Sequence, residues 1–129
     1  MANEIRLVDR TEFARGSVLS RPAQPQQYAI ATTSELVSDA VQVVGTTHEA
    51  IEPGDVTDSA FCRVENLSAT AVVTVGGDAS TVFVPWFSIP PGGPPATIPL
   101  VESLSDTYLK SDTASTPVRV TLIKVVAPA

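Results

Sequence analysis

Few residues in this chain are suited to catalysis. The 129-residue sequence contains one histidine, His48, and one cysteine, Cys62. A serine or cysteine nucleophile would need His48 as its base, but His48 lies in the polar, turn-like stretch 46–49, and no Gly-x-Ser-x-Gly motif occurs. One histidine and one cysteine cannot form a closed Cys/His zinc site. We therefore expect no catalytic residue, no metal and no cofactor, and interpret the chain as non-enzymatic.

The richest group of oxygen ligands lies between residues 49 and 58. Its carboxylates belong to Glu49, Glu52, Asp55 and Asp58, and Ca²⁺ prefers such ligands. Their spacing does not match the calcium-binding loop of an EF-hand. An acidic turn before a strand explains the same residues. Both interpretations stay open, and calcium binding is the less favoured one because the ligand spacing does not match.

Aromatic residues that could bind a sugar are scattered. Trp86, Tyr28 and Tyr108 lie far apart in the sequence, and no pair of opposed acids accompanies them, as a glycosidase would require. Trp86 lies between Pro85 and Phe87 and could form a ligand platform. A tryptophan contributes a large buried area, so an anchor in a core or an interface is the favoured interpretation.

The charge of the chain argues against nucleic acid as a partner. The formal net charge is −6 and the pI is about 4.5, so DNA phosphates should repel the protein. Residues 1–21 differ from the rest, because four arginines against three carboxylates give them a net charge of +1. This segment could contact an acidic neighbour, although scattered exposed charges are an equal alternative. Its candidate interface residues are Arg6, Arg10, Arg15 and Arg21.

Size and composition predict one soluble domain. Hydrophobic residues make up 43% of the chain and charged residues 17%, a balance that allows a compact core. No apolar run is long enough for a membrane helix, and the first residues do not resemble a signal peptide, so we expect synthesis in a cytoplasm and no membrane partner. The single cysteine excludes an intrachain disulfide. We expect Cys62 to be a buried structural thiol.

Short β-strands must position these residues. Valine, isoleucine and threonine suit a pleated, half-buried surface, and apolar residues alternate with polar ones in several segments. Residues 37–44 are β-branched and end at Gly45, whereas sustained helical spacing is absent. Ala60, Cys62 and Val64 should share one face of a strand. In the last strand, predicted over 118–126, Val118, Val120 and Leu122 should point inward.

The segment 81–89 is apolar on both faces, with Val82, Val84 and Trp86 opposed to Phe83 and Phe87. That pattern is typical of a strand covered on one side by the opposite sheet and on the other by a neighbouring segment or subunit. Pro85 predicts an edge strand or a bulge. The preceding Gly-Gly-Asp at 76–78 predicts a hairpin turn. We name Phe83, Trp86 and Phe87 as candidate interface residues.

Eight or nine such strands with regular turns predict an all-β fold, an antiparallel β-sandwich of jelly-roll type. Residues 10–27 contain few apolar residues and two X-Pro steps, which is typical of an extended arm. We therefore divide the chain into an N-terminal strand and arm, 1–27, and a sandwich domain, 28–129.

From Arg63 onward, the chain resembles small structural proteins of tailed-phage virions. The resemblance covers about half the chain. It depends on a strand ending in Asn-Leu, a Val-rich strand ending in Gly, a Phe-x-Pro strand, a Pro-Gly loop, a Leu-x-Lys segment and a terminal strand, here 63–67, 73–76, 83–85, 89–92, 109–113 and 117–120. In 109–113 the leucine and the lysine are adjacent, which departs from the Leu-x-Lys spacing. The loop has Pro-Gly-Gly where those proteins have Pro-Gly-Glu, and residues 1–58 have no counterpart.

This resemblance implies a non-enzymatic bacteriophage virion component. It would be a capsid decoration (cement) protein, or a head–tail, collar or fibre protein, located in the virion. Its partners would be copies of itself, with a homotrimer expected, and the major capsid protein or another virion protein. The alternative is a carbohydrate- or receptor-binding β-sandwich module, based on the fold class, the acidic stretch and Trp86. A jelly-roll hydrolase or isomerase is the least favoured, because the chain has one histidine.

Overall fold

The computed structural model describes residues 3–9, 13–15, 18–20, 26–32, 37–54, 56 and 59–124, and its strands form two units. In the first unit, β1 (Asn3–Asp9) pairs with β4 (Gln26–Thr32), and β2 (Phe13–Arg15) pairs with β3 (Val18–Ser20), both antiparallel. The predicted sandwich domain begins at residue 28, but residues 28–32 belong to β4, the strand that pairs with β1. The predicted arm contains the β2–β3 pair.

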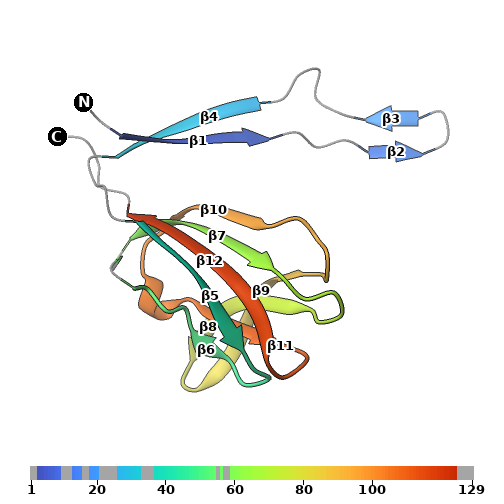
Figure 1. The fold of residues 1–129 in the computed structure, drawn as a ribbon, viewed down its shortest axis with the longest axis vertical. Coiled ribbons are helices and arrows are strands. Elements are labelled where there is room, and N and C mark those ends of the chain that lie inside the picture. Colours follow the sequence, from blue (N-terminus) through green and yellow to red (C-terminus); the bar gives the residue numbers. More distant parts are fainter. Residues whose placement is uncertain are drawn as a thin grey trace. The chain divides into compact units, whose positions relative to one another are not determined.

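The second unit is a sandwich of two four-stranded antiparallel sheets (Figure 1). Sheet I has the order β10-β7-β12-β5, and sheet II has the order β6-β11-β8-β9. The strands are β5 (Val37–Val44), β6 (Glu49–Ala50), β7 (Ala60–Asn66), β8 (Val73–Ala79), β9 (Val82–Ile89), β10 (Ala96–Val101), β11 (Tyr108–Ser111) and β12 (Thr116–Lys124).

The pairing is nested, which defines the topology. The first strand of the sandwich pairs with the last (β5 with β12), the second with the seventh (β6 with β11), the third with the sixth (β7 with β10), and the fourth with the fifth (β8 with β9). A long hairpin rolled up on itself gives this pattern, which is the jelly roll. The predicted all-β antiparallel sandwich of jelly-roll type is confirmed.

The core lies between the sheets because apolar residues recur at every second position. In β12, Val118, Val120 and Leu122 are buried while Arg119 points outward, and in β7 Val64 is buried, as the alternation predicted. Valine is frequent here because its β-branch favours the extended backbone and packs well on a pleated surface. The one helical element described is a short 3-10 turn, η1 (Leu104–Asp106).

Two buried amides connect the strands. Gln42 Nε2 in β5 donates to Glu49 Oε1 and to the Ala50 carbonyl, both at 3.0 Å, and so holds the start of β6. Asn66 Nδ2 at the end of β7 donates to the Ala71 carbonyl at 2.8 Å and to the Ile89 carbonyl at 3.1 Å. A buried polar group without a partner is costly, so these bonds fix both loops in place.

The hairpin between β8 and β9 exists, but the turn predicted at 76–78 is wrong. The turn residues are Ser80 and Thr81, with φ of 53° and 71°. Gly76 and Gly77 instead lie inside β8. A Cβ on Gly76 would approach the Val84 carbonyl oxygen to 2.2 Å, so the glycine permits close contact between strands rather than a turn.

Candidate protein interface on an edge strand

β9 is an edge strand with a bulge. Among the described strands it pairs with β8 alone. Val75 faces Phe87 and Gly76 faces Pro85, so Trp86 is an extra residue on β9. The structure therefore confirms both features that Pro85 predicted. Proline cannot donate to a ladder, and the bulge interrupts it, so this edge is poorly suited to continuous pairing with another strand.

The bulge changes the faces on which the side chains lie. Phe87 faces the buried Val75, and Val84 faces Gly77, on the side of sheet II that turns toward sheet I. The indole of Trp86 also lies over Gly77, because a Cβ there would be 3.1 Å from Trp86 Cζ2. Phe87 thus shares a face with Val84 and Trp86, and our assignment of Phe87 to the face of Phe83 is wrong, since the extra residue shifts the alternation.

Four apolar side chains on this face of β9 remain exposed. Val82 is 63% and Trp86 is 54% exposed, and Val84 and Phe87 are also exposed. We call these four residues the flank row. Scattered exposed apolar residues are normal on monomers, but a continuous row that includes tryptophan and phenylalanine is typical of an interaction site. Trp86 is therefore not a core residue in this unit, and its roles as an interface anchor or as a ligand platform stay predictions.

The flank row borders a groove of about 460 Å³ at the open side of the sandwich. Trp86 and Phe87 of β9 form one wall, and Ile98 and Val101 of β10 form part of the other. Two carboxylates, from Glu102 and Asp106, lie among the lining residues. The groove lining therefore combines apolar side chains with two carboxylates.

A second apolar row lies on the opposite flank. Sheet I has two edge strands, β10 beside the groove and β5 on the opposite side. In β5, Val41 is 54% and Val43 is 60% exposed, and Val37 at the start of the strand is also exposed. Asp39, between them, accepts two hydrogen bonds from Arg119, from Nε at 2.9 Å and from Nη2 at 2.6 Å. These bonds hold the pKa of Asp39 at about 2. We name the three valines the β5 row.

The predicted arginines cannot be compared with this surface. The structure describes the strands that contain Arg6 and Arg15 but not the side chains of these strands. Arg10 and Arg21 are not among the described residues. The structure does place Phe83, Trp86 and Phe87 on one strand. It separates them, because Phe83 points to the outer face of sheet II and the other two point to the flank.

Phe83 belongs to a cluster that the sequence did not reveal. The His48 ring centroid lies 5.4 Å from that of Phe83 and 5.4 Å from that of Tyr108. His48 Nε2 donates to Asp78 Oδ2 at 2.7 Å, and this bond lowers the pKa of Asp78. The bonded residues are 30 positions apart in the chain. Their proximity depends on strand register, which no local motif encodes.

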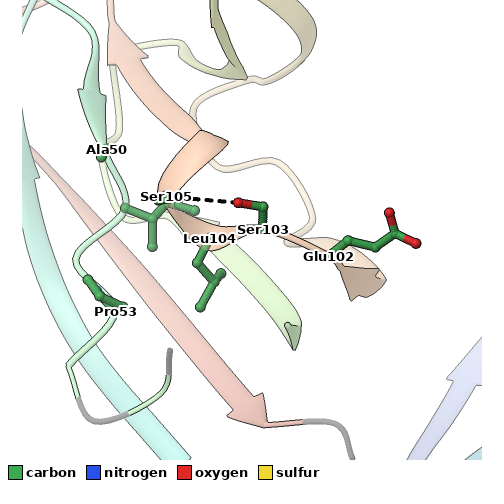
Figure 2. A pocket seen from close by; sticks show the side chains of 7 residues that line it. Ala50, Pro53, Glu102, Ser103, Leu104 and Ser105 are labelled. Carbon is green, nitrogen blue, oxygen red and sulfur yellow. Dashed lines mark hydrogen bonds between the residues drawn. The ribbon is translucent and has the colours of Figure 1, made fainter. Parts of the chain in front are cut away.

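A recess of about 350 Å³ between β6 and η1 offers little chemistry (Figure 2). Its lining is Ala50, Ile51, Pro53, Glu102, Ser103, Leu104 and Ser105, and the hydroxyls of Ser103 and Ser105 bond to each other at 3.1 Å. Figure 2 shows the Glu102 carboxylate pointing away from Pro53. A few apolar groups and a satisfied hydroxyl pair form no reactive arrangement.

The expected buried thiol is confirmed. Cys62 is fully buried, and desolvation raises its pKa to about 12, so it is an inert core residue. Among the residues that the structure describes, no three His, Cys, Asp or Glu side chains could together hold a metal ion. Asp55 and Asp58 of the acidic stretch lie outside them, so cation binding there stays untested. Within the described part, no helix is long and apolar enough to cross a membrane.

Comparison of the chain with protein-family models, with curated proteins and with solved structures finds no match.

Proposed function

We propose that this protein is a non-enzymatic structural component of a tailed-phage virion, a capsid decoration protein or a head–tail accessory protein. In this role it associates with copies of itself and docks on another virion protein. The observation that supports the proposal most is the flank row on β9, which a single copy leaves exposed. Jelly rolls are frequent in viral shell proteins, although a fold alone does not define a function.

The two apolar rows favour a ring. The flank row and the β5 row lie on opposite sides of the sandwich. On one side, residues of β9 and β10 line a common groove, and on the other side Gln42 of β5 is hydrogen-bonded to Ala50 of β6. A contact between unlike surfaces is heterologous, and such contacts form a ring of three or more copies when the rotation between copies closes, or an open filament when it does not. A trimer is the smallest ring, in agreement with the homotrimer expected from the resemblance.

Charge supports a role for the N-terminal segment in the same contact. The segment 1–21 has a net charge of +1 while the remaining residues have −7. The groove beside the flank row has Glu102 and Asp106 in its lining. Arginines from a neighbouring copy are suited to these two carboxylates, since a guanidinium pairs with a carboxylate through two hydrogen bonds.

The proposal is tested on purified phage particles from the host that encodes the chain. Quantitative mass spectrometry should find the protein in the particles in a fixed ratio to the major capsid protein, and electron cryo-microscopy should locate it in the shell, neck or tail. A protein made during infection but missing from purified particles refutes the virion role.

A further inference from the structure

The outer face of sheet II contains a hollow that lies on the other side of β9 from the flank row. It measures about 500 Å³ and lies over β8, whose Thr74 is small. Phe83 and Pro85 of β9 line one side, and Lys110 and Asp112 line the other. We call this hollow the β8 trough. Its size is in the range of small-ligand sites, which are about 300–1,000 Å³.

The aromatic wall of the trough is held in place from behind. Gly76 leaves room for the Phe83 ring, since a Cβ there would lie 2.8 Å from ring atoms. The His48 ring lies 5.4 Å from the Phe83 ring, and His48 is itself fixed by Asp78 at 2.7 Å and by Tyr108 at 5.4 Å. A ring ordered before binding loses little entropy when a ligand packs on it, which favours affinity.

The polar lining of the trough contains one cation, Lys110, one carboxylate, Asp112, and the hydroxyl of Thr74. Lys110 Nζ lies 5.7 Å from the Phe83 ring centroid, and within the described residues it forms no ion pair. Asp112 Oδ1 accepts a hydrogen bond from Val72 N at 3.0 Å, which fixes the carboxylate. The Thr74 hydroxyl at the floor shares a hydrogen bond of 3.0 Å with Ser88 Oγ, and its remaining hydrogen-bonding capacity faces the trough.

We propose that the β8 trough binds a carboxylate-bearing saccharide of the hexuronic acid class. The C–H face of the sugar packs against Phe83, its carboxylate pairs with Lys110, and its hydroxyls bond to Asp112 and Thr74. A charge-assisted bond to an ammonium is stronger than a neutral one, so the acidic sugar is preferred over its neutral form. The net charge of −6 opposes anions at long range, so we expect millimolar affinity.

The test uses the full chain labelled with ¹⁵N and three probes: methyl β-D-glucuronide, methyl β-D-glucoside and acetate. The glucuronide should shift the amide signals of Thr74, Phe83 and Lys110 in a saturable way. The glucoside should bind about tenfold more weakly, and acetate should cause no saturable shift. Absence of saturable shifts with the glucuronide, or equal affinity for glucuronide and glucoside, overturns the proposal.

Variants distinguish the ionic contact made by Lys110 from the packing contact made by Phe83. Lys110→Met keeps the apolar stem and should weaken glucuronide binding about tenfold while leaving glucoside binding unchanged. Phe83→Leu should weaken both. Arg63→Gln, on the outer face of sheet I, removes one positive charge far from the trough and is the matched control. Equal losses in the Lys110 and Arg63 variants overturn the proposal. The site is independent of the virion role, because a protein missing from particles could still bind the sugar.

Discussion

At the residue scale, Asp39 and Arg119 form a two-bond ion pair whose effect on pKa can be measured directly. The pair holds the pKa of Asp39 at about 2, against an ordinary value of 3.8. A depressed folded-state pKa means that the stabilisation is complete above pH 3.8 and is lost as the pH falls through 2. We predict that Arg119→Gln moves the Asp39 midpoint toward 3.8 in a carboxyl ¹³C NMR titration.

The control for this titration is Asp78, which titrates in the same spectra. Asp78 lies in β8 of the other sheet, and its pKa is lowered mainly by the hydrogen bond to His48, so Arg119→Gln should leave the pKa of Asp78 unchanged. An Asp39 midpoint near 3.8 in the unaltered protein would contradict the ion pair.

Asn66 explains why a strand of this unit ends in Asn-Leu. Its amide donates to two backbone carbonyls in the interior, and a carboxylate of the same shape cannot donate. We predict that Asn66→Asp lowers the free energy of unfolding by roughly 3 kcal/mol, measured by urea denaturation. Leu67→Asp adds the same charge at the next, exposed position and should cost under about 1 kcal/mol. Equal costs for the two variants would show that the buried bonds contribute nothing.

At the element scale, the β8–β9 hairpin depends on Gly76. A Cβ there would lie 2.2 Å from the Val84 carbonyl oxygen, and backbone cannot move aside without separating the strands. We predict that Gly76→Ala destabilises the protein by about 2 kcal/mol or more in thermal denaturation. Gly45→Ala is the control, because nothing lies within 4 Å of a Cβ at that position. A Gly76 variant as stable as the Gly45 variant would contradict the close approach.

The sequence pattern predicted most strands of the sandwich, but it predicted only part of how these strands pair with one another. Alternation in 60–66 and 116–124 follows from burial on one face, a property of each strand alone. The role of Gly76 and the bulge at Trp86 depend on contacts across the hairpin. The same holds for the cluster of His48 and Phe83, because strand register brings together residues that are distant in sequence. Local patterns therefore predicted the sandwich and an edge strand, but not the β8 trough.

At the scale of the whole molecule, the sandwich contains its own hydrogen-bonded sheets and its own core. Its strands β5–β12 cluster separately from β1–β4. We predict that a chain of residues 34–129 retains a cooperative melt with a midpoint within about 5 °C of the full chain, measured by calorimetry. Loss of cooperativity on truncation would mean that the N-terminal strands belong to the folding unit.

The same truncation should weaken assembly, since the segment it removes contains Arg6, Arg10, Arg15 and Arg21. A truncated chain that assembles as strongly as the full chain would leave the arginines without a role in the contact. The apolar rows would then be sufficient for association.

The central claim is that a second copy covers the flank row, and sedimentation velocity tests it most directly. The account predicts that the full chain forms a closed oligomer of three or more copies at micromolar concentration. Trp86→Ser with Val84→Thr should yield folded monomers with a cooperative melt, because Trp86 is 54% and Val84 is 43% exposed in the single copy. Their melting temperature should lie below that of the full chain, because they lose the stabilisation that association gives. A full chain that sediments as a monomer at every concentration, or a double variant that assembles normally, would contradict the account.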